Sequence, residues 1–225
     1  FLAKFATVVV LQVVLLAVVM LCSIAVQLLH GYTKLELGQY LFQLFVLQLS
    51  GNVLIAVLAF AVHTLIDHKY IGHFLVGIVF LVILQLPSFG FEDRLYLYAS
   101  APGLLYSDLN GWGHFLPAFF WFRLYWLAFA TLLMVLSYAL WVRGRELRVA
   151  ARLRTAAARM RAPAWTVAGV AAVVFVATGA WIFHNTHVVN PFVSRYEGRH
   201  LAAEYEKRYR RFFGAPQPRI TAVAV

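Results

Sequence analysis

The sequence predicts an all-α protein, a polytopic membrane bundle of about five transmembrane helices with a cytoplasmic basic helix and an extracytoplasmic linker helix. Two observations lead to this fold class. Of the 225 residues, 63% are hydrophobic and only 12% are charged, whereas about a quarter of the residues in an average soluble domain are charged. The apolar residues also gather in runs of about 20, the length that a helix needs to cross roughly 30 Å of hydrocarbon.

The first two predicted spans differ in their polar content. Residues 5–29 are almost entirely apolar, and this run is too long for a secretory signal peptide. Residues 41–66 form the second predicted span and carry several polar side chains at helical spacing. Polar groups at membrane depth need protein partners rather than lipid. We therefore expect this helix to lie inside the bundle, with Gln48 and Asn52 nearest to any substrate pathway.

The third and fourth predicted spans flank the one long loop between helices. Residues 71–89 form the third span, which ends at a proline and a glycine. We expect the loop of residues 91–115 to lie at headgroup depth, because Tyr and Trp favour that depth, and its acidic residues to be exposed. The fourth predicted span, residues 116–142, begins with a cluster of aromatic residues that is typical of an interfacial belt.

Seven arginines follow the fourth span, between residues 143 and 161. Interleaved with alanine and leucine, they predict a basic helix near a membrane surface. Residues 164–183 form the fifth predicted span, which completes a transmembrane region of residues 1–184. Residues 185–225 are predicted to be a linker that contains an amphipathic helix.

Positive charge near short loops predicts the orientation, because it marks the cytoplasmic side. The arginine-rich segment and the hairpin at residues 67–69 are then inside. The turn at residues 30–40, the 91–115 loop and the C-terminal tail are then outside. The tail is also rich in basic residues, so an inverted topology is the alternative.

The sequence contains none of the catalytic or metal-binding motifs that we sought. A paired-His metalloprotease helix, a phosphate-binding glycine loop and a nucleophile elbow are all missing, and the single cysteine, Cys22, rules out a disulfide framework. We therefore name no catalytic residue and no metal ligand. The net charge is +10, and the basic residues lie beside the spans. Contact with lipid headgroups and the topology of the chain explain this placement better than nucleic-acid binding does.

The histidines raise a separate alternative, a di-haem cytochrome. Two lie near the predicted inner surface and three near the outer one, and such a cytochrome needs a ligand pair on each side. All of them are at span ends or in loops, which favours ordinary interfacial residues. These histidines are His63, His73, His30, His114 and His184.

Two polar segments could contact a cytoplasmic ATPase. The hairpin is either a docking site or an ordinary polar turn, and the arginine helix either anchors at anionic lipid or contacts an acidic protein surface. The candidate ATPase contacts are Asp67, His68, Lys69, Arg145, Arg148 and Arg152.

Several aromatic and polar runs between residues 63 and 221 are similar to those of a known family. They are Tyr106-Ser107-Asp108-Leu109-Asn110-Gly111-Trp112-Gly113-His114-Phe115, Phe120-Trp121-Phe122-Arg123-Leu124-Tyr125-Trp126, Asn190-Pro191-Phe192 with Tyr196-Glu197-Gly198, and Ala203-Glu204-Tyr205-Glu206-Lys207 leading to Pro216-Gln217-Pro218-Arg219-Ile220-Thr221. These runs resemble a family of bacterial fusion proteins, in which the permease region of a type-two ABC exporter is joined to a zinc aminopeptidase similar to aminopeptidase N.

The resemblance implies a membrane-spanning permease segment that works with a separate ATPase subunit in a bacterial inner membrane. It also implies a multi-pass topology whose C-terminal tail leads outside to a zinc aminopeptidase domain, with residues 219–225 as its first strand. Zinc would then belong to that further domain and ATP to the partner subunit, so no residue here inherits those ligands. The expected partners are the lipid bilayer, the ATPase, and a second copy or another permease half, with no nucleic acid. The alternative is a membrane anchor for the peptidase without a transport role, which the lack of acidic residues in the spans favours.

Overall fold

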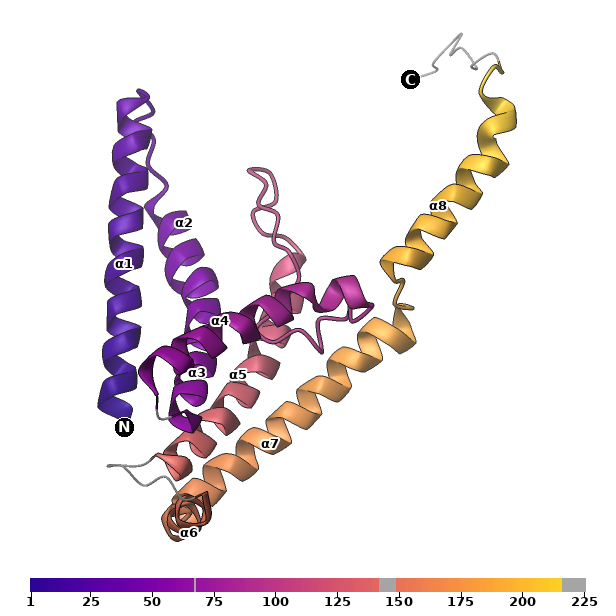
Figure 1. The fold of residues 1–225 in the computed structure, drawn as a ribbon. Helices are drawn as coiled ribbons and strands as arrows, with labels where there is room; N and C mark the ends of the chain where they lie inside the picture. The colour runs from indigo at the N-terminus through magenta and orange to yellow at the C-terminus, as the bar shows by residue number, and fades with distance from the viewer. Residues whose placement is uncertain (67, 142–148, 216–225) are drawn as a thin grey trace.

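The fold is an all-α bundle, shown as a computed structural model in Figure 1. The structure describes residues 1–66, 68–141 and 149–215. Five helices among these residues are long and apolar enough to cross a membrane, namely Leu2–Leu29, Leu37–Leu65, Tyr70–Phe89, Phe115–Leu140 and Ala162–Val189. An isolated bridge between Ser107 and Gly111 is the only β-pairing in the described part of the chain. The prediction of an all-α, multi-pass membrane protein with about five spans is therefore confirmed.

Three of these helices are built from more than one type of helical turn. In chain order the elements are α1 (Leu2–Leu29), α2 (Leu37–Leu41), the π-helix η1 (Phe42–Gln48), α3 (Leu49–Leu65), α4 (Lys69–Gln85), η2 (Leu86–Phe89), α5 (Phe115–Leu140), α6 (Val149–Arg159), α7 (Ala162–Phe183), the π-helix η3 (His184–Val189), α8 (Arg195–Tyr209) and η4 (Arg210–Phe212). The second span thus runs through α2, η1 and α3 without a break.

Most span boundaries differ from the prediction by a few residues. The second span begins at Leu37 rather than at residue 41, and the fourth ends at Leu140 rather than at residue 142. The fifth continues past residue 183 to Val189, although the first four added residues are polar. Thr186 continues the helix because its hydroxyl donates to the Ile182 carbonyl at 2.8 Å, which satisfies a polar group within the helix itself.

The centre of the bundle is α5, which packs against both α3 and α7. Its buried face includes Phe119, Phe122 and Trp126, which recur at the spacing of one helix face. The predicted interfacial belt at the start of this helix is therefore wrong for these residues, since they form part of the protein core. Phe120 and Trp121, on the other side of the helix, are exposed and remain consistent with contact to lipid.

Small residues allow α7 to approach α5 closely. Tyr125 of α5 stacks on Phe175 of α7 with ring centroids 4.5 Å apart. A Cβ atom at Gly179 would lie only 3.0 Å from Cε2 of the Tyr125 ring. Close backbone approach at small residues is how helices associate in lipid, where water does not drive apolar groups together.

The first part of the loop after α4 lies against the core. Tyr98 is buried, and its hydroxyl donates to the Leu54 carbonyl of α3 at 2.8 Å. Burial raises the pKa of Tyr98 above its ordinary value, so the hydroxyl remains a neutral donor. Leu54 lies roughly 26 Å along the helix from Leu37 at 1.5 Å per residue, well inside the span.

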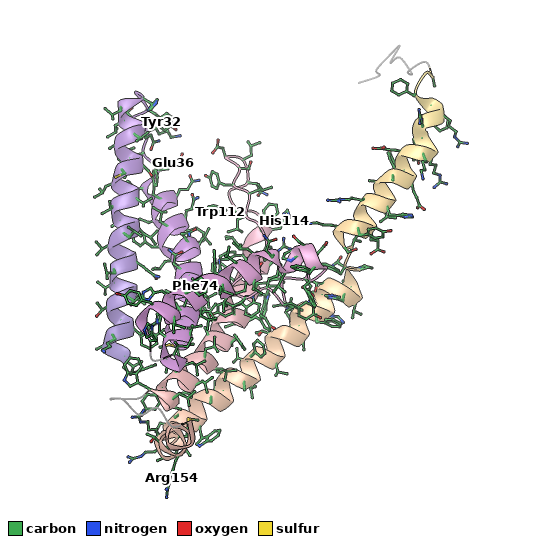
Figure 2. All side chains as sticks on the ribbon, viewed as in Figure 1. Tyr32, Glu36, Phe74, Trp112, His114 and Arg154 are labelled. Carbon is green, nitrogen blue, oxygen red and sulfur yellow. The ribbon has the colours of Figure 1, made fainter. Side chains whose placement is uncertain are left out.

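The first part of the loop therefore belongs to the protein core, which the sequence did not predict. Figure 1 shows why: α4 runs at a steep angle to α1 and α3, so that its C-terminal end stays near the middle of the bundle. Irregular backbone at membrane depth is tolerated where protein surrounds it, and here α3 and α5 do so. Near the end of the loop, the Trp112 ring lies against the second span, with its centroid 6.2 Å from that of Phe42 (Figure 2).

The same loop contacts the end of α7. Asp93, which we expected to be exposed, is buried, and its Oδ2 lies 3.3 Å from Nε2 of His187. This distance suits a charge pair when His187 is protonated, but the N–H is not aligned for a hydrogen bond, since Asp93 Oδ2 has no hydrogen-bond partner. The His187 ring stacks between those of Phe183 and Phe192, with centroids 4.4 and 5.5 Å away.

Two oxygens cap the start of α8, the predicted linker helix. The Ser194 side chain accepts from the backbone N–H of Glu197 at 3.2 Å, and a Glu92 carboxylate oxygen accepts from that of Arg195 at 2.6 Å. Negative charge near a helix N-terminus is favourable. The loop after α4 therefore holds both the end of the fifth span and the beginning of the linker helix.

The connections lie at two opposite ends of the bundle. In Figure 2, Arg154 of α6 lies at one end, whereas Tyr32 and Glu36 lie at the other. Figure 1 places the N-terminus at the end of α6, and α8 beyond the opposite end of α7. The turn after α1 and helix α8 therefore lie opposite to the N-terminus and α6.

Candidate functional site

Polar side chains meet near the middle of the second span. Nε2 of Gln48 donates to Oδ1 of Asn52 at 3.1 Å, and Nε2 of Gln12 in α1 donates to the Asn52 backbone carbonyl at 3.3 Å. The two residues predicted to lie nearest a pathway are therefore in direct contact with each other. Their bond leaves the two amide N–H donors of Asn52 available, because its carbonyl oxygen is the acceptor.

Arg123 of α5 faces these residues and was not among the residues predicted from the sequence. Its Nη1 donates to the Ala99 carbonyl of the loop at 2.8 Å, and its guanidinium carbon lies 4.7 Å from the centre of the Phe119 ring. Nε is buried without a hydrogen-bond partner. Nη2 lies 3.0 Å from the position that a Cβ atom at Gly51 would occupy, so the missing side chain lets Arg123 lie close to the second span.

Arg123 had a clear signal in the sequence. It is the only Asp, Glu, Lys or Arg within the five predicted spans. A charged side chain at that depth is costly, and it is a functional-site hypothesis by default. Its position eight residues into α5 corresponds to roughly 12 Å along the helix axis.

Two cavities meet at Arg123. One of about 390 Å³ lies between the second span, the end of α4 and the loop, with Gly51, Asn52 and Tyr98 among its lining residues. The other, of about 260 Å³, extends toward the start of the second span and is lined in part by Gln43 and Trp112. Gln48 and Arg123 line both cavities.

A third and larger cavity lies beyond these two, toward the end of the bundle that holds Tyr32. It has a volume of about 540 Å³, and its lining includes Lys34, Glu36 and Asp108. Gln43 lines this cavity as well as the 260 Å³ one. Polar side chains therefore connect one end of the bundle to Arg123.

The π-helix η1 explains how two glutamines five positions apart can both line the 260 Å³ cavity. In an ordinary α-helix, Gln43 and Gln48 would lie roughly 140° apart around the axis. Both residues belong to η1, whose wider i to i+5 turn brings such positions closer to one face. Sequence periodicity did not predict this turn, because no residue type marks it.

The candidate ATPase contacts lie together at one end of the bundle as far as the structure describes them. His68 caps α4, since its Nδ1 accepts from the backbone N–H of Ile71 at 3.4 Å. Lys69 is the first residue of α4 and Arg152 belongs to α6, but both side chains lie outside the described part. Asp67, Arg145 and Arg148 lie outside the described residues altogether.

Two of the histidines considered as haem ligands, His63 and His73, lie together. Their rings touch nearly edge to face with centroids 4.6 Å apart, which leaves no space for a porphyrin between them in this arrangement. Within residues 1–66, 68–141 and 149–215, no group of three or more His, Cys, Asp or Glu residues could hold a metal ion.

Comparisons with known proteins do not assign the chain to a family. No family model matches it, and neither a curated protein nor a solved structure does. The resemblance to exporter and aminopeptidase fusions therefore stays a prediction from the quoted runs.

Proposed function

We propose that this chain is the membrane-spanning permease segment of a type-two ABC exporter in a bacterial inner membrane. In this proposal it works with a separate ATPase subunit and pairs with a second copy or another permease half. The C-terminal tail is extracytoplasmic and leads to a zinc aminopeptidase domain. The family resemblance of the sequence supports each of these statements.

One observation in the membrane region favours transport: Arg123 lies between two cavities with Gln48 and Asn52. A helix that only anchors another domain has no need of a charged side chain at this depth, where the charge opposes insertion. A permease needs polar groups that can hold a substrate partway across the bilayer. The connection of the cavities to one end of the bundle supports the same function.

The exporter also needs a surface for the ATPase. We assign this role to the hairpin at residues 67–69 and to the arginine-rich segment. The start of α4 and helix α6, which belong to them in part, lie at the same end of the bundle. In Figure 1, α6 lies across the end of α5 and α7, as a helix on a membrane surface would. This end is cytoplasmic in the proposed orientation.

The coupling can be tested with the full-length parent protein and the ATPase encoded beside it. We expect the membrane protein to change the ATPase rate, and Lys69→Glu or Arg152→Glu to reduce that change. Lys207→Glu, at an exposed position of α8, is the matched control and should have no effect. An ATPase rate that changes neither when the membrane protein is added nor when Lys69 is replaced by Glu would contradict the proposal.

The second candidate is a membrane anchor for the peptidase without transport. It is favoured by the five span sequences, which contain no Asp or Glu, although pumps often use such residues. Cleavage near Ala215 would release the peptidase and separate the two functions. Full cellular function after cleavage, with no transport activity lost, would favour the anchor.

A further inference from the structure

We infer that the cavities at Arg123 bind an amphiphilic anion, whose carboxylate or phosphate head contacts the guanidinium and whose apolar part lies along α4. The inference names a ligand class for the site on which the proposed function rests. It concerns binding, which can be measured separately from transport.

The charge of the site favours an anion. Arg123 supplies the only formal charge on the walls of the two cavities that meet there. Among the described residues, no carboxylate lies within 4.0 Å of its guanidinium. A partly buried charge that is not balanced by a carboxylate is unfavourable, so an anion in the cavity would stabilise Arg123 as well as bind to it.

The hydrogen-bonding groups at the site are mainly donors. Among the described residues, Nε of Arg123 has no hydrogen-bond partner, and the Asn52 amide keeps its two N–H donors while its oxygen accepts from Gln48. Carboxylate and phosphate oxygens accept such bonds, and charge assistance strengthens them. A cation would instead need oxygen ligands from acidic side chains, which neither cavity wall contains.

The wall of the 390 Å³ cavity toward α4 is apolar. It includes Ile55 of α3 and Phe80, Ile83 and Leu84 of α4. A small hydrophilic anion would leave these side chains against water, whereas a hydrocarbon chain would cover them. Apolar walls with a few convergent polar groups are typical of small-molecule sites.

Arg123 is also held in a fixed position. Its bond to the Ala99 carbonyl, its contact with the Phe119 ring and its close approach to Gly51 act from three sides. Tyr98, next to Ala99, is itself bonded to α3. A guanidinium that is already oriented loses less freedom when it binds an anion.

The test is equilibrium binding to the purified full-length protein in nanodiscs made of zwitterionic lipid. The probe is a long-chain fatty acid with a fluorescent or spin label, compared with the alcohol of the same chain length. We expect the acid to bind at least about tenfold more tightly than the alcohol, because the alcohol cannot make the charge-assisted hydrogen bond to the guanidinium. Equal binding of the two would overturn the inference.

Variants locate the site. Arg123→Gln should weaken binding of the acid at least about tenfold, and Arg123→Lys should lose less because it keeps the charge. Arg94→Gln, at an exposed loop arginine, is the control and should bind as the unsubstituted protein does. Unchanged binding in Arg123→Gln would overturn the inference.

A second pair of variants keeps the charge of Arg123. It tests the site even if the Arg123→Gln protein does not fold. Gly51→Ala puts a methyl group 3.0 Å from Nη2, so we expect the guanidinium to shift and binding to weaken. Gly77→Ala meets nothing within 4 Å and should leave binding unchanged. Equal effects of the two substitutions would contradict a site at Arg123.

Two further measurements identify the source of the anion and separate the proposals. An anionic lipid that copurifies with the protein, and is lost in Arg123→Gln, would identify the bilayer as the source. Binding of added long-chain acid without such a lipid would identify a soluble source, whereas tight binding of inorganic phosphate alone would overturn the amphiphilic ligand. Binding without ATP-dependent movement of the acid would keep the inference and contradict the exporter.

Discussion

The helices α1 and α5 are of similar length, but they occupy opposite positions in the packing. α1 packs mainly on the second span, with Lys4 also over the Trp141 ring after α5, and it buries one residue, Leu16, although it is the more hydrophobic of the two. α5 packs between α3 and α7 and buries eight residues. In lipid, apolar character alone does not bring helices together, because the acyl chains are as apolar as the side chains.

The shapes of the side chains and their few polar contacts account for this difference. α5 has aromatic side chains that interlock with α7, a glycine opposite Tyr125, and Arg123 bonded to the loop. α1 presents mostly branched aliphatic side chains, and its described bonds to the second span come from Gln12 and Gln27. We therefore expect the exposed side of α1 to contact lipid or another copy of the membrane region.

The largest effect should come from the buried face of α5. Phe122→Ala should lower the free energy of unfolding by about 3 kcal/mol, because it leaves a cavity in the core cluster. Phe120→Ala, at a neighbouring side chain that is 43% exposed, should change it by less than about 0.5 kcal/mol. Unfolding by SDS in bicelles measures both, and equal losses would contradict the assigned buried face.

An intermediate effect should come from overfilling the contact between α5 and α7. Gly179→Leu should destabilise the fold by about 2 kcal/mol, because the new side chain meets the Tyr125 ring. Gly169→Leu lies on the same helix, where nothing is within 4 Å of the added Cβ, and it should be nearly neutral. Thermal unfolding in detergent compares the two, and a harmless Gly179→Leu would show that the helices are not so close.

The smallest effect should come from α1. Leu16→Ala should lower stability by about 1 kcal/mol, below the range for soluble cores, because lipid replaces part of the lost contact. Leu15→Ala, at a side chain that is 62% exposed, should have no measurable effect in the monomer. A loss from Leu15→Ala that depends on protein concentration would place α1 in an interface between copies.

The sequence was informative where one span could be considered by itself. Gln48 and Asn52 were expected inside the bundle because polar groups are costly in lipid, and the structure brings them together. The interfacial belt was predicted wrongly because aromatic residues favour both headgroups and cores, and only the neighbours of Phe122 distinguish the two. Asp93 and Tyr98 were assigned to a loop surface because composition does not show that a loop returns to the core.

By itself, the sequence determined the all-α class and the five spans, because the length of an apolar run follows directly from the thickness of the bilayer. It also contained the lone charge at Arg123 within those spans. Only the tertiary structure decided what that charge meets. The rotation of each helix, the π-turn of η1 and the angle of α4 depend on contacts between segments far apart in the chain, and these together place Arg123 beside Gly51, Asn52 and the Ala99 carbonyl.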